Sequence, residues 1–294
     1  KVERNIAYTG CKAVSEKKKN GPTIAVLGEL DSLICMAHPD CNPENGYMHA
    51  CGHNIQVSVM YGVAAAMTRC GVLDQLGGNI EFMAVPAEEY IELDYRSRLK
   101  KEGKIQYFSG KAEAIRKGAF DDVDMAVMAH NYPISEQGYK CSPASAWNGF
   151  IGKQVRFIGK QAHAGGAPWD GINALNMANL AMTGMHFQRE TFHDDDKVRI
   201  HGIITKGGEV VNSVPDDVKM ELTVRARNIK ALQDANEKVN RSIKGAAIAI
   251  GGSAVVEDTP GQMPLKYNKG LADAYTENAR LFYKEEEILP YLDT

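Results

Sequence analysis

Short apolar runs alternate with segments of helical periodicity through the first half of the chain. The runs occupy residues 2–8, 23–30, 79–85 and 124–129, and the last of them is expected to be a buried strand. The first two have the pattern of neighbouring strands joined by a charged turn. Apolar residues at helical spacing fill residues 57–67, with Gly71 just beyond, and residues 111–117 form a shorter helical pattern. Because strands that alternate with helices usually pair in parallel, the sequence predicts an α/β fold, a mixed, mostly parallel sheet flanked by helices.

The pattern changes near Trp147. Amphipathic strands are predicted at 150–158, 198–205 and 219–225, and two helices at 173–189 and 230–249. This β-α-β-β-α-β-like order is typical of a small α+β open sandwich. Residues 262–283 then look like a return to the first pattern, which indicates an inserted domain. We therefore predict a first domain of residues 1–148 and 262–294, and an inserted domain of residues 149–261.

Composition excludes several classes of protein. A chain of 294 residues favours two domains, and 44% hydrophobic with 24% charged residues is typical of an ordinary globular protein. The formal net charge of -3 argues against nucleic-acid binding. No apolar run is long enough to cross a bilayer, and the first residues do not resemble a signal peptide. Both ends of the sequence read as cropped.

The cysteines point to a cellular compartment. The chain has six, none in a C-x-x-C spacing, and they do not form the framework of a small disulfide-rich domain. We expect free thiols in a reducing compartment, and so a cytoplasmic protein.

A candidate metal site lies in residues 47–54, Y-M-H-A-C-G-H-N. Cys51 and His53 are two positions apart, so in an extended segment they share a face, which His49 joins. A thiolate beside imidazoles suits zinc, with cobalt or manganese possible. Buried Cys and His residues are also often only core, so this motif alone leaves both interpretations open.

Adjacent carboxylates follow the apolar run 79–85. Glu88 and Glu89 come directly after its end, where a merely solvated pair is less expected. Neighbouring side chains of an extended chain point in different directions, so one carboxylate can bind a metal while the other faces a water. Metal-assisted hydrolysis requires such a ligand beside a general base.

Two further residues stand at strand ends. His130 follows the run 124–129, where a lone His is more often a hydrogen-bonded core or turn residue than a ligand. Asp31 follows the run 23–30 and is either the orienting partner of a ligand imidazole or a turn cap. Loops beyond the carboxyl ends of parallel strands are where α/β sheets place their chemistry.

Five motifs in order give the chain a family resemblance. They are G-E-L-D-S-L, H-A-C-G-H-N, V-P-A-E-E, M-A-H-N and G-K-Q-A-H-A-G-G-A-P. Together they resemble the metallopeptidase family of aminoacylases, hippurate hydrolases, auxin-conjugate amidohydrolases and aminobenzoyl-glutamate hydrolases. H-A-C-G-H-N with G-G-E-V-V-N-S-V-P is most similar to the aminobenzoyl-glutamate hydrolase B-subunit branch and related dipeptidases.

The resemblance implies a site of two divalent metal ions with a bridging thiolate. Zinc is the expected metal, and manganese and cobalt stay possible. The implied ligands are Cys51, His53, Glu89 and His130. The resemblance also makes Glu88 the general base and Asp31 the orienting residue. It makes residues 149–261 a dimerisation domain, and hence the chain a homodimer.

In that domain the resemblance implies three residues that contact substrate. His163 would reach the substrate carbonyl, and Asn212 and Arg225 would hold the substrate carboxylate. Two departures stand out. Glu29 occupies a position that is a metal-ligand His in other branches, and a last His ligand belongs to a C-terminal segment outside this sequence.

The resemblance implies hydrolysis of the amide of an N-acyl or aminobenzoyl amino acid or a dipeptide, with Glu88 moving the proton. A second interpretation is a non-catalytic or partner-dependent subunit of the same fold that binds such ligands. A third, a nucleotide-binding α/β protein, is weak because no G-x-G-x-x-G or G-x-x-x-x-G-K-[ST] follows a strand.

Overall fold

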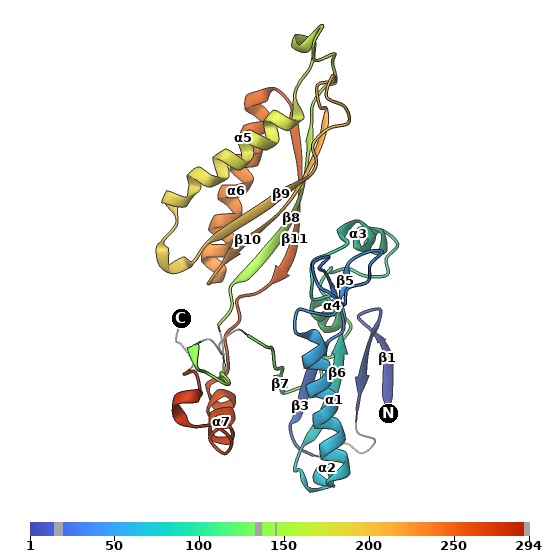
Figure 1. Cartoon of the computed structure of the whole chain (residues 1–294), viewed down its shortest axis with the longest axis vertical. Helices are drawn as coiled ribbons and strands as arrows, with labels where there is room; N and C mark the ends of the chain where they lie inside the picture. Colours follow the sequence, from blue (N-terminus) through green and yellow to red (C-terminus); the bar gives the residue numbers. More distant parts are fainter. Residues whose placement is uncertain (15–19, 133–136, 145, 291–294) are drawn as a thin grey trace. The chain divides into compact units, whose positions relative to one another are not determined.

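The computed structural model describes residues 1–14, 20–132, 137–144 and 146–290. Its contacts divide the chain into two compact units, Lys1–Pro133 and Ile134–Thr294 (Figure 1). Each unit has its own sheet, and each is described by itself below.

The first unit is built on a five-stranded mixed sheet. Its strands, in spatial order, are β1 (Val2–Ile6), β2 (Gly10–Ala13), β6 (Asn79–Val85), β3 (Thr23–Glu29) and β7 (Met125–Val127). Strand β3 pairs in parallel with β6 and β7, whereas β2 is antiparallel to β6 and to β1. The predicted α/β class is confirmed. The expectation that residues 2–8 and 23–30 are neighbouring strands is wrong, because β2 and β6 lie between them.

Helices follow the strands of this unit. They are α1 (His53–Arg69), α2 (Val72–Gln75), α3 (Leu93–Lys101) and α4 (Gly110–Arg116), and a two-stranded ribbon joins β4 (Leu33–Ile34) to β5 (Tyr47–Met48). Helix α1 packs against β3 (Figure 1). A Cβ at Gly28 would lie 3.2 Å from the Cα of Val57, so glycine permits this close approach. The helix predicted at 57–67 is present, but it begins earlier, at His53, and ends at Arg69.

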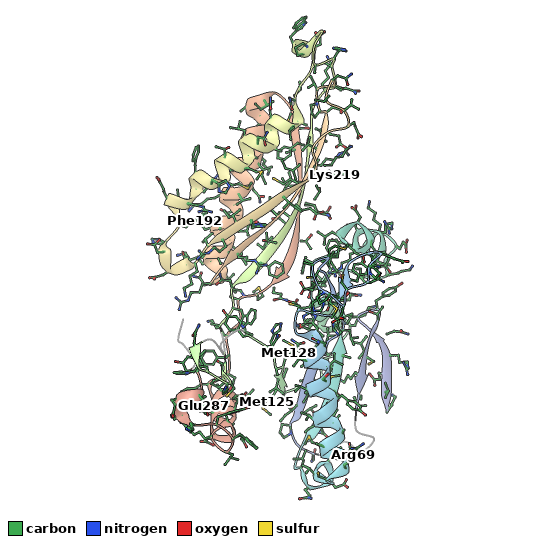
Figure 2. The ribbon with its side chains drawn as sticks, in the orientation of Figure 1. Arg69, Met125, Met128, Phe192, Lys219 and Glu287 are labelled. Atoms are coloured by element: carbon green, nitrogen blue, oxygen red, sulfur yellow. The ribbon has the colours of Figure 1, made fainter. Side chains whose placement is uncertain are left out.

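The core of the first unit is small. Ala25, Leu27, Met83 and Val85 are buried in it, with Phe120 and Val123 packed alongside. The run 124–129 was expected to be buried, but Val127 at the end of β7 and Met128 after it are exposed in the structure, and Figure 2 labels Met128. The expectation failed because β7 lies at the edge of the sheet, so its apolar composition does not report burial.

The second unit contains a four-stranded antiparallel sheet and two long helices. Along the chain these are β8 (Gly149–Ile158), α5 (Ala174–Phe187), β9 (Arg199–Lys206), β10 (Asp217–Ala226), α6 (Ile229–Ile250) and β11 (Ser253–Gln262). The strands lie in the order β11-β8-β10-β9. Both helices pack against the sheet, and the side chains of this layer are drawn in Figure 2. The predicted β-α-β-β-α-β order is confirmed.

Each of these helices begins at an asparagine cap. The side chain of Asn173 accepts a hydrogen bond from the backbone N–H of Asn176, and that of Asn228 from Ala231. These caps satisfy backbone N–H groups that the first helical turn leaves unpaired. The buried face between helices and sheet includes Phe157, Met177, Met220, Val239 and Ile243.

Helix α7 (Lys269–Ala279) follows β11 and belongs to the second unit. In the same unit, two isolated backbone β-bridges pair Trp147 with Leu265 and Cys141 with Ile288. The assignment of residues 1–148 and 262–294 to one domain stays a prediction. No helix among the described residues combines the length and the apolar composition that crossing a bilayer would require.

Candidate metal centre

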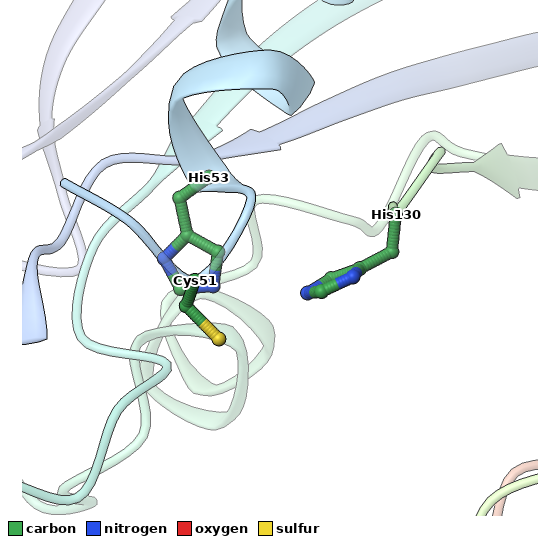
Figure 3. A group of neighbouring side chains, drawn as sticks. All are labelled: Cys51, His53 and His130. Atoms are coloured by element: carbon green, nitrogen blue, oxygen red, sulfur yellow. The ribbon is translucent and has the colours of Figure 1, made fainter. Parts of the chain in front are cut away.

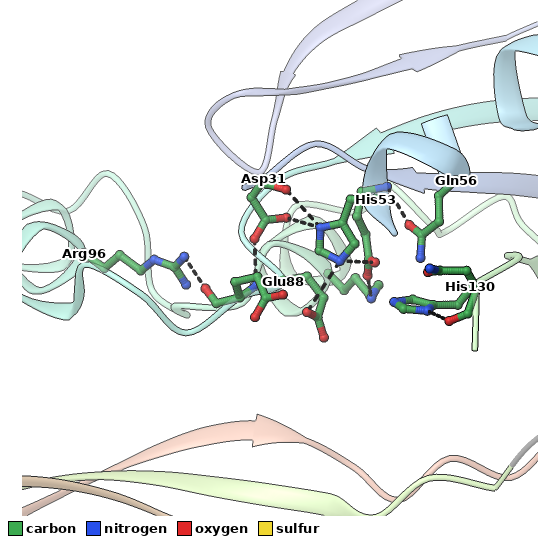
Figure 4. A network of polar contacts seen from close by, with 10 residues as sticks. Asp31, His53, Gln56, Glu88, Arg96 and His130 are labelled. Carbon is green, nitrogen blue, oxygen red and sulfur yellow. Dashed lines mark hydrogen bonds and ion pairs between the residues drawn. The ribbon is translucent and has the colours of Figure 1, made fainter. Parts of the chain in front are cut away.

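The polar residues singled out at strand ends come together in the first unit. Strands β3, β6 and β7 run in the same direction, so their carboxyl ends lie at one edge of the sheet. The segments after these ends carry Asp31, Glu88 and His130. Figure 4 shows these side chains around His53, which comes from the start of α1.

His53 is the first residue of a helix, not part of an extended segment. Gly52 precedes it in a left-handed conformation, with φ of 86°. A Cβ at Gly52 would lie 1.6 Å from Oδ1 of Asn131. The expectation that His49, Cys51 and His53 project from one face of a strand is therefore wrong. The turn at Gly52 brings the side chains together instead, and the rings of His49 and His53 meet edge to face at 6.2 Å.

Cys51, His53 and His130 form one candidate ligand group. One ligand atom from each lies within 4.8 Å of the others (Figure 3). The rings of His53 and His130 are 6.1 Å apart between centroids and nearly perpendicular, at 89°. A thiolate with two imidazoles is a donor set that zinc accepts.

The neighbours of His53 fix the orientation of its ring. Nδ1 lies 3.0 Å from the carbonyl oxygen of Asp31 and 3.5 Å from Oδ1 of the same residue. Both atoms can accept a hydrogen bond from Nδ1, an arrangement that favours the tautomer in which Nε2 is available to bind a metal ion. Oδ2 of Asp31 accepts a 2.7 Å hydrogen bond from the backbone N–H of Glu89. An Asp31 that orients the His53 ring would need these contacts. The orienting role of Asp31 stays a prediction.

A second candidate group surrounds Nε2 of His53. Oε2 of Glu29 is 3.0 Å away and Oε2 of Glu88 is 3.9 Å away. Within the described part of the chain, no hydrogen-bond donor reaches this buried Nε2. An imidazole nitrogen with carboxylate oxygens around it is a donor set that divalent metal ions accept. The residues therefore fit a divalent metal ion.

Cys51 contacts the remaining predicted ligand, Glu89. Burial raises the pKa of the Cys51 thiol to about 12, and the hydrogen bond to the Glu89 carboxylate and the charges of Glu89, Glu88 and Glu29 contribute to this rise. The thiol therefore stays protonated at neutral pH until a cation replaces the proton.

We expect metal binding to release about one proton from Cys51 at neutral pH, because the pKa of the free thiol lies far above 7. Metal affinity should then rise with pH. Calorimetric titration with Zn²⁺ in two buffers of different ionisation enthalpy measures the released protons. Cys51→Ser should release about one proton fewer per chain than the parent, and an unchanged count would contradict the assignment.

Sequence reasoning missed the cations beside these carboxylates. The Lys111 ammonium contacts Oε1 of Glu29, and the buried Arg96 guanidinium donates to the carbonyl oxygens of Glu89 and of Phe108, the latter at 3.1 Å. Lys111 stands 82 positions from Glu29, and no local pattern links the two. Glu29 itself could have been singled out from the sequence, because it is a polar residue at the end of an apolar strand, β3.

The second unit brings His163 and Asn212 together. The backbone N–H of Ala164 donates to the carbonyl oxygen of Asn212 at 2.9 Å, and His163 pairs with Ser213 in an isolated backbone β-bridge. Nδ1 of His163 accepts hydrogen bonds from Gly165 at 3.2 Å and Gly166 at 2.8 Å. With Nδ1 accepting, the ring proton is on Nε2, which can donate a hydrogen bond.

Arg225 lies elsewhere in that unit. Its guanidinium stacks over the Phe150 ring, 5.2 Å from the centroid. Gly159, shortly before His163, bonds to Asp216 at one end of β10, whereas Arg225 is near the other end. The strand from Asp217 to Arg225 is roughly 26 Å long. Within one copy of this unit, Arg225 and Asn212 therefore do not line a common pocket.

Comparisons with known proteins agree on one family. Residues 146–249 match the model of the M20 peptidase dimerisation domain. The Xaa-Arg dipeptidase of Mus musculus is 32% identical over 278 residues, which cover 90% of this chain and 55% of that protein. One of the p-aminobenzoyl-glutamate hydrolase subunits of Escherichia coli (strain K12) is 29% identical, over 84% of this chain and 48% of that protein. This chain carries an M20 peptidase dimerisation domain.

Solved structures show the same fold for this chain. An aminobenzoyl-glutamate utilization protein from Klebsiella pneumoniae aligns with a TM-score of 0.67 at 21% identity, over 98% of this chain and 63% of that one. A dinuclear metal-binding M20 peptidase from Bacillus subtilis aligns with a TM-score of 0.61 at 22% identity, over 100% of this chain and 72% of that one. The chain spans about half the length of the curated relatives above.

Proposed function

We propose that this chain carries the catalytic residues of a metal-dependent amidohydrolase. Its substrate would be the amide of an N-acyl or aminobenzoyl amino acid or of a dipeptide. The observation that carries the proposal is the convergence of thiol, imidazole and carboxylate groups around His53 at one edge of a sheet. The names of relatives, which include a dipeptidase, an aminobenzoyl-glutamate hydrolase and an N-acetylcysteine deacetylase, support the reaction class.

The metal ligands in this proposal are Cys51, His53, Glu89 and His130. They would hold two divalent ions, with zinc favoured over manganese or cobalt because of the thiol and imidazoles. Bound cations of this kind polarise a carbonyl and lower the pKa of water. Asp31 keeps the His53 ring in the tautomer that leaves Nε2 available, through the contact at Nδ1.

Glu88 is the general base and acid. It is partly exposed, and its Oε2 lies 3.9 Å from His53 Nε2, so the carboxylate reaches both the ligand group and incoming water. It would take a proton from the attacking water and return it to the leaving amine.

The second unit would complete the site through dimerisation. We propose a homodimer that forms through residues 149–261, which include most of the matched dimerisation domain. The Nε2–H of His163 would donate to the substrate carbonyl, and Asn212 beside it would bind the substrate carboxylate. Because Arg225 is far from Asn212 in one unit, its predicted contact with the carboxylate would involve a second copy.

An activity screen tests this proposal. We expect the chain, loaded with Zn²⁺ or Mn²⁺, to release free amine from at least one of three substrate sets. These are N-acyl amino acids, aminobenzoyl-glutamate and basic dipeptides. Activity should disappear with a chelator and return with added metal. A metal-loaded chain that hydrolyses none of them would contradict the proposal.

One observation favours a second candidate function. Several relatives are named as one or the other of two different subunits of a p-aminobenzoyl-glutamate hydrolase. A partner-dependent chain would bind metal and substrate, yet turn over only when a second, different chain is added. Equilibrium binding of aminobenzoyl-glutamate to the metal-loaded chain, measured beside turnover, separates this function from an enzyme that acts alone.

We also propose that the protein works in the cytoplasm. All six cysteines are free thiols in the structure. Free thiols, of which Cys51 is needed as a metal ligand, persist best in a reducing compartment.

A further inference from the structure

We propose that Glu29 is itself a metal ligand of this chain, and that Lys111 positions its carboxylate for that task. The proposal concerns the same centre as the proposed function and rests on that centre binding metal. It does not depend on which bond is hydrolysed.

The first support is the distance between the donor atoms. Two ligands that lie about 2.0–2.1 Å from a tetrahedral ion are roughly 3.3 Å apart. Oε2 of Glu29 and Nε2 of His53 are 3.0 Å apart, close to that separation, whereas Oε2 of Glu88 is 3.9 Å from the same nitrogen. Of these two carboxylates, Glu29 is therefore better placed to share an ion with Nε2.

The second support is the burial of this contact. Nε2 of His53 and Oε2 of Glu29 face each other, and Glu29 and His53 are each 1% exposed, so bulk water does not hydrate either atom. Nδ1 of His53 faces two oxygens of Asp31, which leaves Nε2 as the nitrogen that can bind a metal ion. A divalent ion held by both atoms would be coordinated by a buried imidazole and a buried carboxylate.

The third support is the way in which Glu29 is held. Its backbone N–H donates to Oε1 of the buried Gln56 at 3.1 Å. The Lys111 ammonium contacts Oε1 of the carboxylate, which leaves Oε2 directed at His53. One oxygen of the Glu29 carboxylate is thus neutralised by Lys111, and the other points at an imidazole nitrogen. This is the arrangement of a metal ligand, Glu29, with a residue that supports it, Lys111.

An ordinary buried ion pair in the same unit provides a comparison. Lys12 pairs with the buried Glu81 at 2.7 Å and also with Asp122 at 2.8 Å. Glu81 belongs to neither candidate ligand group among the described residues. A Glu→Gln change there breaks a lysine pair without touching the metal centre, so it is a matched control.

Metal titration of the whole chain without substrate tests the proposal. We expect Glu29→Gln either to lose one of the ions that the parent binds or to bind it at least about tenfold more weakly. In the Co²⁺ form, the visible d–d absorption should change because one oxygen donor is lost. Glu81→Gln should keep the parent stoichiometry and spectrum. Lys111→Gln should keep the parent number of ions, since it removes a positioning residue and not a ligand.

Three results would overturn the assignment. The first is that Glu29→Gln binds every ion with an affinity within about twofold of the parent, well short of the expected loss. The second is that Glu29→Gln and Lys111→Gln are indistinguishable in stoichiometry and spectrum, which would make Glu29 only the partner of Lys111. The third is that the parent binds no Zn²⁺, Mn²⁺ or Co²⁺, which would also end the proposed function. Failure of the amide screen with metal binding intact would end the proposed function and leave Glu29 a ligand.

Discussion

Glu88→Gln is expected to lower amide turnover by about 10²- to 10⁴-fold, the usual contribution of a positioned general acid or base. The amide keeps the size of the carboxylate but cannot accept a proton from water. Because Glu88 lies farther from His53 Nε2 than Glu29 does, the variant should still bind the parent number of metal ions. Steady-state turnover with the best substrate of the screen, beside elemental analysis, measures both quantities.

The control for this variant is Glu102→Gln. Glu102 pairs with Lys104 at 2.7 Å on an exposed surface, so the same chemical change there should leave turnover and metal content at parent values. Near-parent turnover of Glu88→Gln would remove Glu88 from the mechanism. Loss of metal together with turnover would make it a ligand.

Gly52→Ala is expected to destabilise the metal centre without altering any proposed ligand. The new Cβ would lie 1.6 Å from Oδ1 of Asn131, and the residue has a positive φ that costs a non-glycine residue about 1–2 kcal/mol. Asn131 must move, and it adjoins His130. We expect lower stability of the metal-free protein in urea, and weaker metal binding in titration.

Gly62→Ala is the matched control in the same helix. Nothing lies within 4 Å of a Cβ at Gly62, and alanine in a helix interior is more favourable than glycine by roughly 0.5–1 kcal/mol. This variant should therefore be slightly more stable and bind metal as the parent does. The combined Gly52→Ala, Asn131→Ala variant should recover part of the loss, because it removes the side chain in the way. No recovery would assign the loss to backbone strain.

Local sequence patterns predicted most elements of both units. Strands β3, β6, β8 and β10 and helices α5 and α6 lie where periodicity and turn residues indicated. Helix α3 was missed, because its sequence L-D-Y-R-S-R-L-K-K is dominated by charged side chains. The burial of β7 was misjudged, since an apolar strand reads the same at the centre or the edge of a sheet.

The sequence by itself determined which chemistry the chain carries. Thiol, imidazole and carboxylate residues follow apolar strands, and parallel strands carry such residues to one edge of a sheet. Only the tertiary structure decided their partners. Contacts between distant segments decide which nitrogen of His53 is available and that Glu29 faces it. They also decide that Lys111 holds Glu29 and that Arg225 is far from Asn212. Periodicity reports which way a side chain faces within its own element, whereas these contacts are set by packing between elements.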